Sequence, residues 1–214
     1  MSSAEEELRR AWRHLAGPDH ELIIADLLAR HRERHRCYHT ATHVMWVLRH
    51  VAELLDAMSP GHRSLYDAAA IRAAALFHDV IYDPTASDNE ARSASLAQQA
   101  LIEVGWQSER VGHVVTMILD TANHYPSSAD AAVLVDADMA VLAADAAGYQ
   151  AYVTGVRCEY SHVSESGWRS GRASVLRGFL LQPQLFATDH GRTRFEHSAR
   201  ANIAAELAGL ERDQ

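Results

Sequence analysis

Apolar residues recur at helical spacing along most of the chain. In the segment 21–35, Leu22, Ile23, Leu27 and Leu28 fall on one helical stripe, with charged residues between them. Similar patterns predict helices over residues 4–15, 21–35, 38–58, 64–77, 88–104, 108–124, 148–163, 169–181 and 192–210. No run of alternating apolar and polar positions predicts a sheet. The pattern therefore predicts an all-α protein.

Turn and capping residues mark the ends of these predicted helices. Asp19 is expected to cap the second helix, and Ser87 followed three residues later by Glu90 fits a capping box. Residues 130–145 are ambiguous, because a short buried strand has a similar apolar run, but their length and alanine content favour a helix. No repeat, low-complexity tract or linker divides the chain, so we expect a single domain over residues 1–214.

Composition and charge indicate a globular protein without a membrane span or a surface for duplex nucleic acid. Hydrophobic residues make up 48% of the 214 residues, which is ordinary for a globular protein. The formal net charge of −8 argues against a duplex nucleic-acid surface, although a bound divalent ion would still allow a small anionic substrate. No stretch reaches the roughly eighteen apolar residues of a membrane span, and the first residues lack an apolar signal core. We expect a cytoplasmic protein without a membrane segment.

The two cysteines, Cys37 and Cys158, are too few for a disulfide framework and lack the paired spacing of a zinc thiolate site. We expect both to be reduced thiols. A role for Cys37 as nucleophile or redox sensor is disfavoured, because no neighbouring residue has an evident reason to stabilise a thiolate.

Four titratable residues adjoin or interrupt apolar runs. They are His43, His78, Asp79 and Asp136. Each alone is explained by a packed histidine or a helix-capping aspartate. Burying a carboxylate costs several kcal/mol without compensation, however, and a divalent cation would compensate all four groups. The doublet His78–Asp79 is expected at a helix end, where the backbone can turn both side chains toward one ion.

His39 precedes His43 by four residues, which would place both on one face of a helix. It is either a further ligand or a protonated group that faces the substrate as a general acid.

Three motifs resemble the HD-domain superfamily of metal-dependent phosphohydrolases. They are YHTATHV (38–44), FHDVIYD (77–83) and DADMAVL (136–142), and further similar pieces extend the likeness over about residues 36–207. The resemblance implies an all-helical bundle of the HD-domain type in which one divalent ion is held by His43, His78, Asp79 and Asp136. YHTATH is also similar to the cyclic-nucleotide phosphodiesterase motif, which implies that His39 is the acid and His43 a ligand.

Some HD-domain proteins hold two metals through additional histidines. His113 and His124 lie in the corresponding interval, and His124 is the better placed as a ligand of a second metal or of phosphate. Asp138 is expected to face away or to hydrogen-bond a ligand. Because the full histidine set of the two-metal classes is missing, we expect one ion per chain.

The resemblance implies hydrolysis of a phosphate ester, on a nucleotide or a related small phosphorylated molecule. Asp79 would bind the metal and orient the attacking water, and His39 would protonate the leaving oxygen. Glu90 and Glu159 are candidates to tether an arginine or a ligating histidine. The arginines expected to neutralise the phosphate are Arg36, Arg157 and Arg172.

The ligand types fit Mn²⁺, Fe²⁺, Co²⁺, Ni²⁺, Zn²⁺ or Mg²⁺, and spacing does not choose among these ions. Two other functions stay open: an HD-type di-iron oxygenase, and a non-catalytic nucleotide-binding regulatory module. The apolar content of the helices is compatible with a homodimer.

Overall fold

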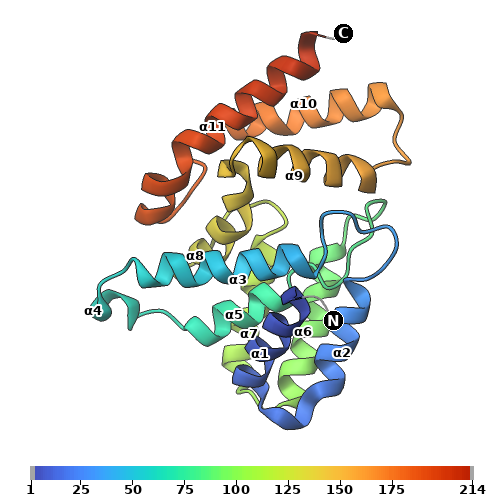
Figure 1. The fold of residues 1–214 in the computed structure, drawn as a ribbon. Coiled ribbons are helices and arrows are strands. Elements are labelled where there is room, and N and C mark those ends of the chain that lie inside the picture. The colour runs from blue at the N-terminus through green and yellow to red at the C-terminus, as the bar shows by residue number, and fades with distance from the viewer. Residues whose placement is uncertain (1–2, 213–214) are drawn as a thin grey trace.

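Helices and their connecting loops make up residues 3–212, the part of the chain that the computed structural model describes, so the all-α prediction is confirmed. Five helices form one group, which lies in the lower half of Figure 1. They are α1 (Ser3–Ala16), α2 (Glu21–Arg30), α5 (Ala68–Phe77), α6 (Asn89–Glu103) and α7 (Ser108–Asp120). The alanine-rich α5 is buried from Ala70 onward except at Arg72, because its small side chains let α1, α3 and α7 pack closely around it.

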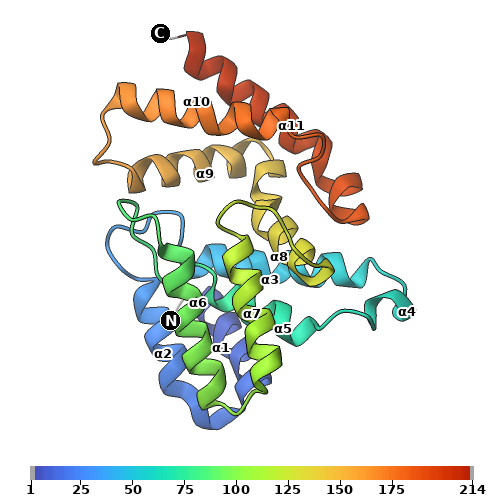
Figure 2. The same ribbon diagram turned by 180° about the vertical axis from the view of Figure 1, so that it is seen from behind.

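Two further helices lie against this group. α3 (Ala41–Asp56) crosses it with an apolar face, and α8 (Ala129–Met139) packs on α3 with almost every residue buried. Figure 2 shows the same contact from behind. The helix expected over residues 130–145 is therefore present, although it tightens into a 3-10 turn, η2 (Ala140–Ala143), before it ends. A short helix, α4 (Pro60–Arg63), follows α3.

The last three helices form a layer above α3 in Figure 1. They are α9 (Ala146–Glu159), α10 (Glu165–Leu181) and α11 (Asp189–Arg212). α11 packs on η2 and α10, and Asn202 of α11 donates hydrogen bonds to the carbonyls of Leu142 and Ala144. One connected hydrophobic core includes residues from α1 through α11. No helix of the described residues is long and apolar enough to cross a bilayer.

Several predicted helix ends differ from the structure. α2 ends at Arg30 rather than continuing to residue 35, and α3 begins only at Ala41. Asp19 does not cap α2, because it lies in the 3-10 turn η1 (Pro18–His20). The predicted capping box at Ser87 does not form either: α6 begins after Asp88, with no side-chain cap. Long-range contacts of residues 31–40 with the end of α5 override helical propensity in this stretch.

Candidate metal centre

Three buried or half-buried side chains from separate helices converge at one point. His43 lies in the first turn of α3, His78 follows the last residue of α5, and Asp138 lies near the end of α8. One ligand atom from each lies within 4.8 Å of the others, so the group can hold a metal ion. The Nε2 atoms of His43 and His78 are 3.2 Å apart, and Asp138 Oδ1 is 3.2 Å from His43 Nε2.

Asp79 completes this cluster. Its Oδ2 atom lies 3.2 Å from His43 Nε2 and 3.0 Å from His78 Nε2. The end of α5 at Phe77 frees the backbone, so the adjacent His78 and Asp79 both face the same point. We refer to His43, His78, Asp79 and Asp138 as the metal cluster.

The orientation of His78 fits a metal ligand. Its Nδ1 lies 2.9 Å from the carbonyl oxygen of Ala75 and donates its hydrogen there. Neutral His78 therefore presents the lone pair of Nε2 to the metal cluster. A bare lone pair facing two carboxylates would be repelled, so this position requires either a proton or a metal cation.

The charges of the metal cluster also indicate that protons or a metal cation must balance its two carboxylates. Burial alone would lower the pKa of His43 and His78, but Asp79 and Asp138 outweigh it, and the pKa of both histidines is raised. Burial would likewise raise the pKa of both aspartates, but the histidines hold each of them below its ordinary value. Without an ion, the two carboxylates thus favour the protonated form of the histidines. A divalent cation would displace those protons and keep the charge balanced.

Asp136 does not join the metal cluster, which corrects the predicted ligand set. Its carboxylate accepts hydrogen bonds from the backbone N–H groups of Ala187 and Thr188 and from the Thr188 hydroxyl, at 2.6–2.8 Å. The Thr188 hydroxyl in turn accepts the N–H of Gly191 in the first turn of α11. Asp136 therefore anchors the start of α11. Asp138, expected to face away or only to hydrogen-bond a ligand, takes the place predicted for Asp136.

A cavity of about 260 Å³ adjoins the metal cluster, and we call it the inner cavity. Its wall includes Asp79 and Asp138 of the cluster, together with His39. Several of its other side chains are aromatic: Tyr38, Tyr82, Tyr152, Tyr160 and Phe179. The cavity can therefore place a small organic molecule beside both the metal cluster and His39.

His39 is held in this wall by Glu159 of α9. Glu159 Oε1 accepts the backbone N–H groups of residues 37, 38 and 39 at 2.8–2.9 Å, and Oε2 lies 2.7 Å from His39 Nδ1. Burial opposes ionisation of Glu159, but the hydrogen bonds from His39 and from the backbone outweigh it and lower the pKa of Glu159 to about 2. A carboxylate at Oε2 requires Nδ1 to be the donor, which leaves His39 Nε2 free for another partner.

His39 is thus outside helix α3 rather than one turn before His43 within it. The backbone of Tyr38 approaches α9 closely at Gly155, where an added Cβ would lie 3.0 Å from the Tyr38 Cβ. Tyr82 stacks on the His39 ring at 4.1 Å between centroids and donates its hydroxyl hydrogen to Glu159. The suggested tether role of Glu159 therefore concerns His39, not an arginine or a histidine of the metal cluster.

The three arginines expected to bind phosphate have other partners. The buried guanidinium of Arg36 donates to the carbonyls of His39, Asp79 and Val80, so it joins the loop of residues 31–40 to the end of α5. Arg157 donates to the carbonyl of Tyr160 and does not line the inner cavity.

Arg172 does line the inner cavity. Its guanidinium makes two hydrogen bonds to the Glu206 carboxylate, at 2.8 and 3.0 Å, and one to the Tyr152 hydroxyl. Glu90 also lines the cavity. The phosphate site predicted from three arginines therefore has one arginine at the cavity wall, already paired.

The two candidate histidines for a second metal lie in different places. His124 lines the inner cavity, with Nε2 3.9 Å from Asp138 Oδ2, and its backbone is left-handed at φ 57°. His113 instead contacts Asp130 at 2.9 Å and does not line the cavity.

Cys37 and Cys158 form a disulfide, so the prediction of two reduced thiols is wrong. The two residues are 121 positions apart in sequence, but Glu159 holds the backbone of residues 37–39 on α9 and brings their Cα atoms to 6.2 Å. The sequence offered no local signal for this pairing.

Comparisons with family models, with curated proteins and with solved structures each give no match.

Proposed function

We propose that this chain is a metal-dependent hydrolase of phosphate esters with an HD-domain type of site. The observation that carries the proposal is the convergence of two imidazoles and two carboxylates beside a cavity that also contains His39. Imidazole and carboxylate ligands without thiolate suit Mn²⁺, Fe²⁺, Co²⁺, Ni²⁺, Zn²⁺ or Mg²⁺. When bound, such an ion polarises a phosphoryl oxygen and lowers the pKa of water.

The residues of this chain would divide the remaining work. Asp79 accepts a hydrogen bond from the attacking water and so orients it toward phosphorus. His39 carries a proton on Nε2 and donates it to the leaving oxygen, while Glu159 fixes the ring through Nδ1. The aromatic walls of the inner cavity bind the organic part of the ester and exclude water.

The test is metal-dependent phosphate release. Metal-depleted protein is reloaded with each candidate ion, and inorganic phosphate is measured over nucleotides and common phosphoesters. We expect turnover in the wild type and in His113→Ala, whose histidine contacts Asp130 and does not line the cavity, but none in His43→Ala. Turnover that survives His43→Ala, or no phosphate release with any ion and any ester, would refute the proposal.

One observation favours the oxidative alternative, a di-iron oxygenase. Asp138 places Oδ1 near His43 and His78, whereas Oδ2 is 3.9 Å from His124 Nε2, so its two oxygens face different histidines. Asp138 could therefore help to hold two ions, one with His43 and His78 and one with His124. Bound iron at two per chain, with dioxygen consumption that is lost in His124→Ala, would favour this function over hydrolysis.

A further inference from the structure

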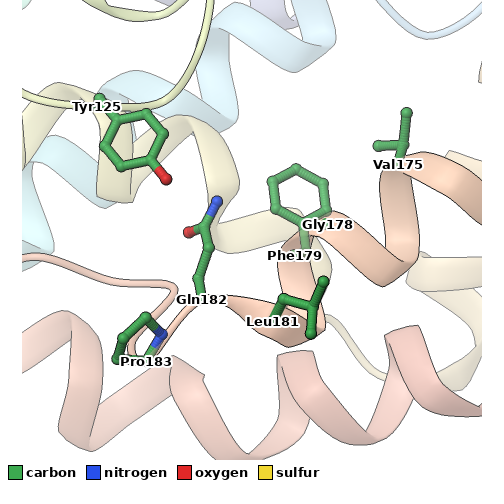
Figure 3. A pocket seen from close by; sticks show the side chains of 7 residues that line it. All are labelled: Tyr125, Val175, Gly178, Phe179, Leu181, Gln182 and Pro183. Atoms are coloured by element: carbon green, nitrogen blue, oxygen red, sulfur yellow. The ribbon is translucent and has the colours of Figure 1, made fainter.

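A second cavity, of about 420 Å³, opens on the surface beside the inner cavity, and we call it the outer groove. Figure 3 shows its lining side chains, contributed by α10, by the segment after it and by Tyr125. Apart from the amide of Gln182, the lining consists of apolar and aromatic residues: Tyr125, Val175, Gly178, Phe179, Leu181 and Pro183. None of these lining residues is charged.

The apolar side chains of the outer groove are unusually exposed for their type. Leu181 is 84% exposed, Tyr125 65% and Val175 51%. They belong to a small set of large apolar residues that remain exposed in the described part of the chain. Three such residues gathered in one concave site indicate a ligand surface rather than scattered exposure.

The outer groove adjoins the inner cavity, because Val175 and Phe179 line both. Arg172, Val175 and Phe179 recur at helical spacing on α10, and the two apolar residues therefore form the border between the cavities. The ring of His124 contacts that of Phe179 at 5.9 Å between centroids, while the next residue, Tyr125, lines the groove. The groove therefore begins at the wall of the inner cavity, and a molecule seated at the metal cluster would reach it by passing the Phe179 ring.

The charges along this route favour an uncharged tail. Three carboxylates line the inner cavity, those of Asp79, Glu90 and Asp138. Arg172 is the only arginine of that lining, and both its terminal nitrogens are engaged by Glu206 and Tyr152. One phosphate can be balanced by the metal ion, but a second phosphate further out would pass three carboxylates, with only the paired Arg172 and the imidazoles of His39 and His124 to offset them, and would then meet an apolar wall.

We propose that the outer groove binds the leaving group of the substrate, and that this leaving group is an uncharged, apolar organic moiety rather than a further phosphate. The inference rests on the proposed function, because it takes the metal cluster as the place of the phosphate. The ester then spans both cavities, with its phosphate at the metal cluster, its ester oxygen beside His39 and its apolar end between Tyr125 and Leu181.

Gly178 provides a test that spares the fold. A Cβ added at Gly178 meets no atom within 4 Å, so a larger side chain can start there, and a leucine is expected to occupy part of the groove that Gly178 lines. Gly171 is the matched control: it lies in the same helix, an added Cβ also meets nothing within 4 Å, and it lines neither cavity. Both substitutions remove a helical glycine, and their effects on helix stability are therefore alike.

The measurement is calorimetric binding of n-alkylphosphonates, which are not hydrolysed, to the full chain loaded with Mn²⁺. Each methylene that enters the groove tightens binding by about fourfold at most. We expect the Kd to fall by about tenfold or more from ethylphosphonate to octylphosphonate in the wild type and in Gly171→Leu. In Gly178→Leu this dependence on chain length should disappear. A charged end should weaken binding, so 6-phosphonohexanoate should bind about tenfold less tightly than hexylphosphonate.

The outcomes separate the two proposals. Phosphonate binding with no dependence on chain length, or equal behaviour of Gly178→Leu and Gly171→Leu, would overturn the groove assignment and leave the hydrolase intact. Tighter binding of 6-phosphonohexanoate than of hexylphosphonate would also overturn it. A failure of every phosphonate to bind would overturn the groove assignment together with the placement of phosphate at the metal cluster. Chain-length-dependent binding without turnover on any ester would overturn the hydrolase and the leaving-group role, and would leave the groove as an apolar ligand site.

Discussion

Replacement of Glu159 by glutamine tests how the loop before α3 is held. In the wild type, five donors converge on one buried carboxylate: three backbone N–H groups, the Nδ1 of His39 and the Tyr82 hydroxyl. An amide has one oxygen and one NH₂ group, so some of these donors would face another donor. The substitution therefore removes the negative charge and acceptor sites of Glu159, while the volume of the side chain stays nearly the same.

The size of the effect follows from the pKa of Glu159. A fall from the ordinary value of 4.5 to about 2 corresponds to about 3 kcal/mol of folding free energy when the group is ionised. Because the folded-state pKa is the lower one, this stabilisation is complete above pH 4.5 and is lost as the pH falls toward 2. At pH 3 about 1.4 kcal/mol should remain.

The assay is urea unfolding of the wild type and Glu159→Gln at several pH values between 7 and 3. The difference in unfolding free energy should be about 3 kcal/mol near neutral pH and should shrink by about half at pH 3. Glu165→Gln is the control, because Glu165 lies in an exposed pair with Arg157 and should change stability little. A difference below about 1 kcal/mol at pH 7, or one that does not vary with pH, would refute this account of Glu159.

Three further predictions concern the metal cluster and α11. Asp138→Ala should lose bound metal by elemental analysis, whereas Asp136→Asn should retain it but unfold at a lower temperature; the reverse result would restore Asp136 as the ligand. His39→Ala should keep the metal and lose turnover, and loss of metal would show that His39 is a ligand and not the acid. Gly191→Ala should destabilise the protein by about 1–3 kcal/mol in thermal unfolding, because the new Cβ would overlap the Asp136 carboxylate. Gly209→Ala in the same helix should not destabilise it, and equal unfolding temperatures of the two variants would contradict the close approach at Gly191.

Helical periodicity predicted the fold class and most helices, because each long helix buries one apolar stripe. It predicted the end of α2 poorly, since the stretch after Arg30 has the composition of a solvated helix end. That stretch is non-helical because Arg36 binds carbonyls of Asp79 and Val80, more than forty positions away. Contacts of this range leave no periodic signal in a sequence.

The two aspartates of α8 show why ligand identity could not be read from spacing. Asp136 and Asp138 are two residues apart, and side chains two apart on a helix point about 200° away from each other. One therefore faces α3 and the metal cluster, and the other faces α11. Both faces of α8 are buried, so the apolar pattern around the pair is the same on either side. Only the packing of α11 on the region after α8 decides which aspartate meets the histidines.

The metal cluster and the proposed acid depend on different parts of the fold. The ligands come from α3, α8 and the end of α5, which pack on one another directly. His39 depends instead on Glu159 of α9, across 120 residues of sequence. Loss of the Glu159 carboxylate should therefore release His39 while His43, His78 and Asp138 still bind the ion. Under the proposed function, metal content and turnover should then be separable, and a variant that retains the first without the second would isolate the contribution of the C-terminal helices to the proposed catalysis.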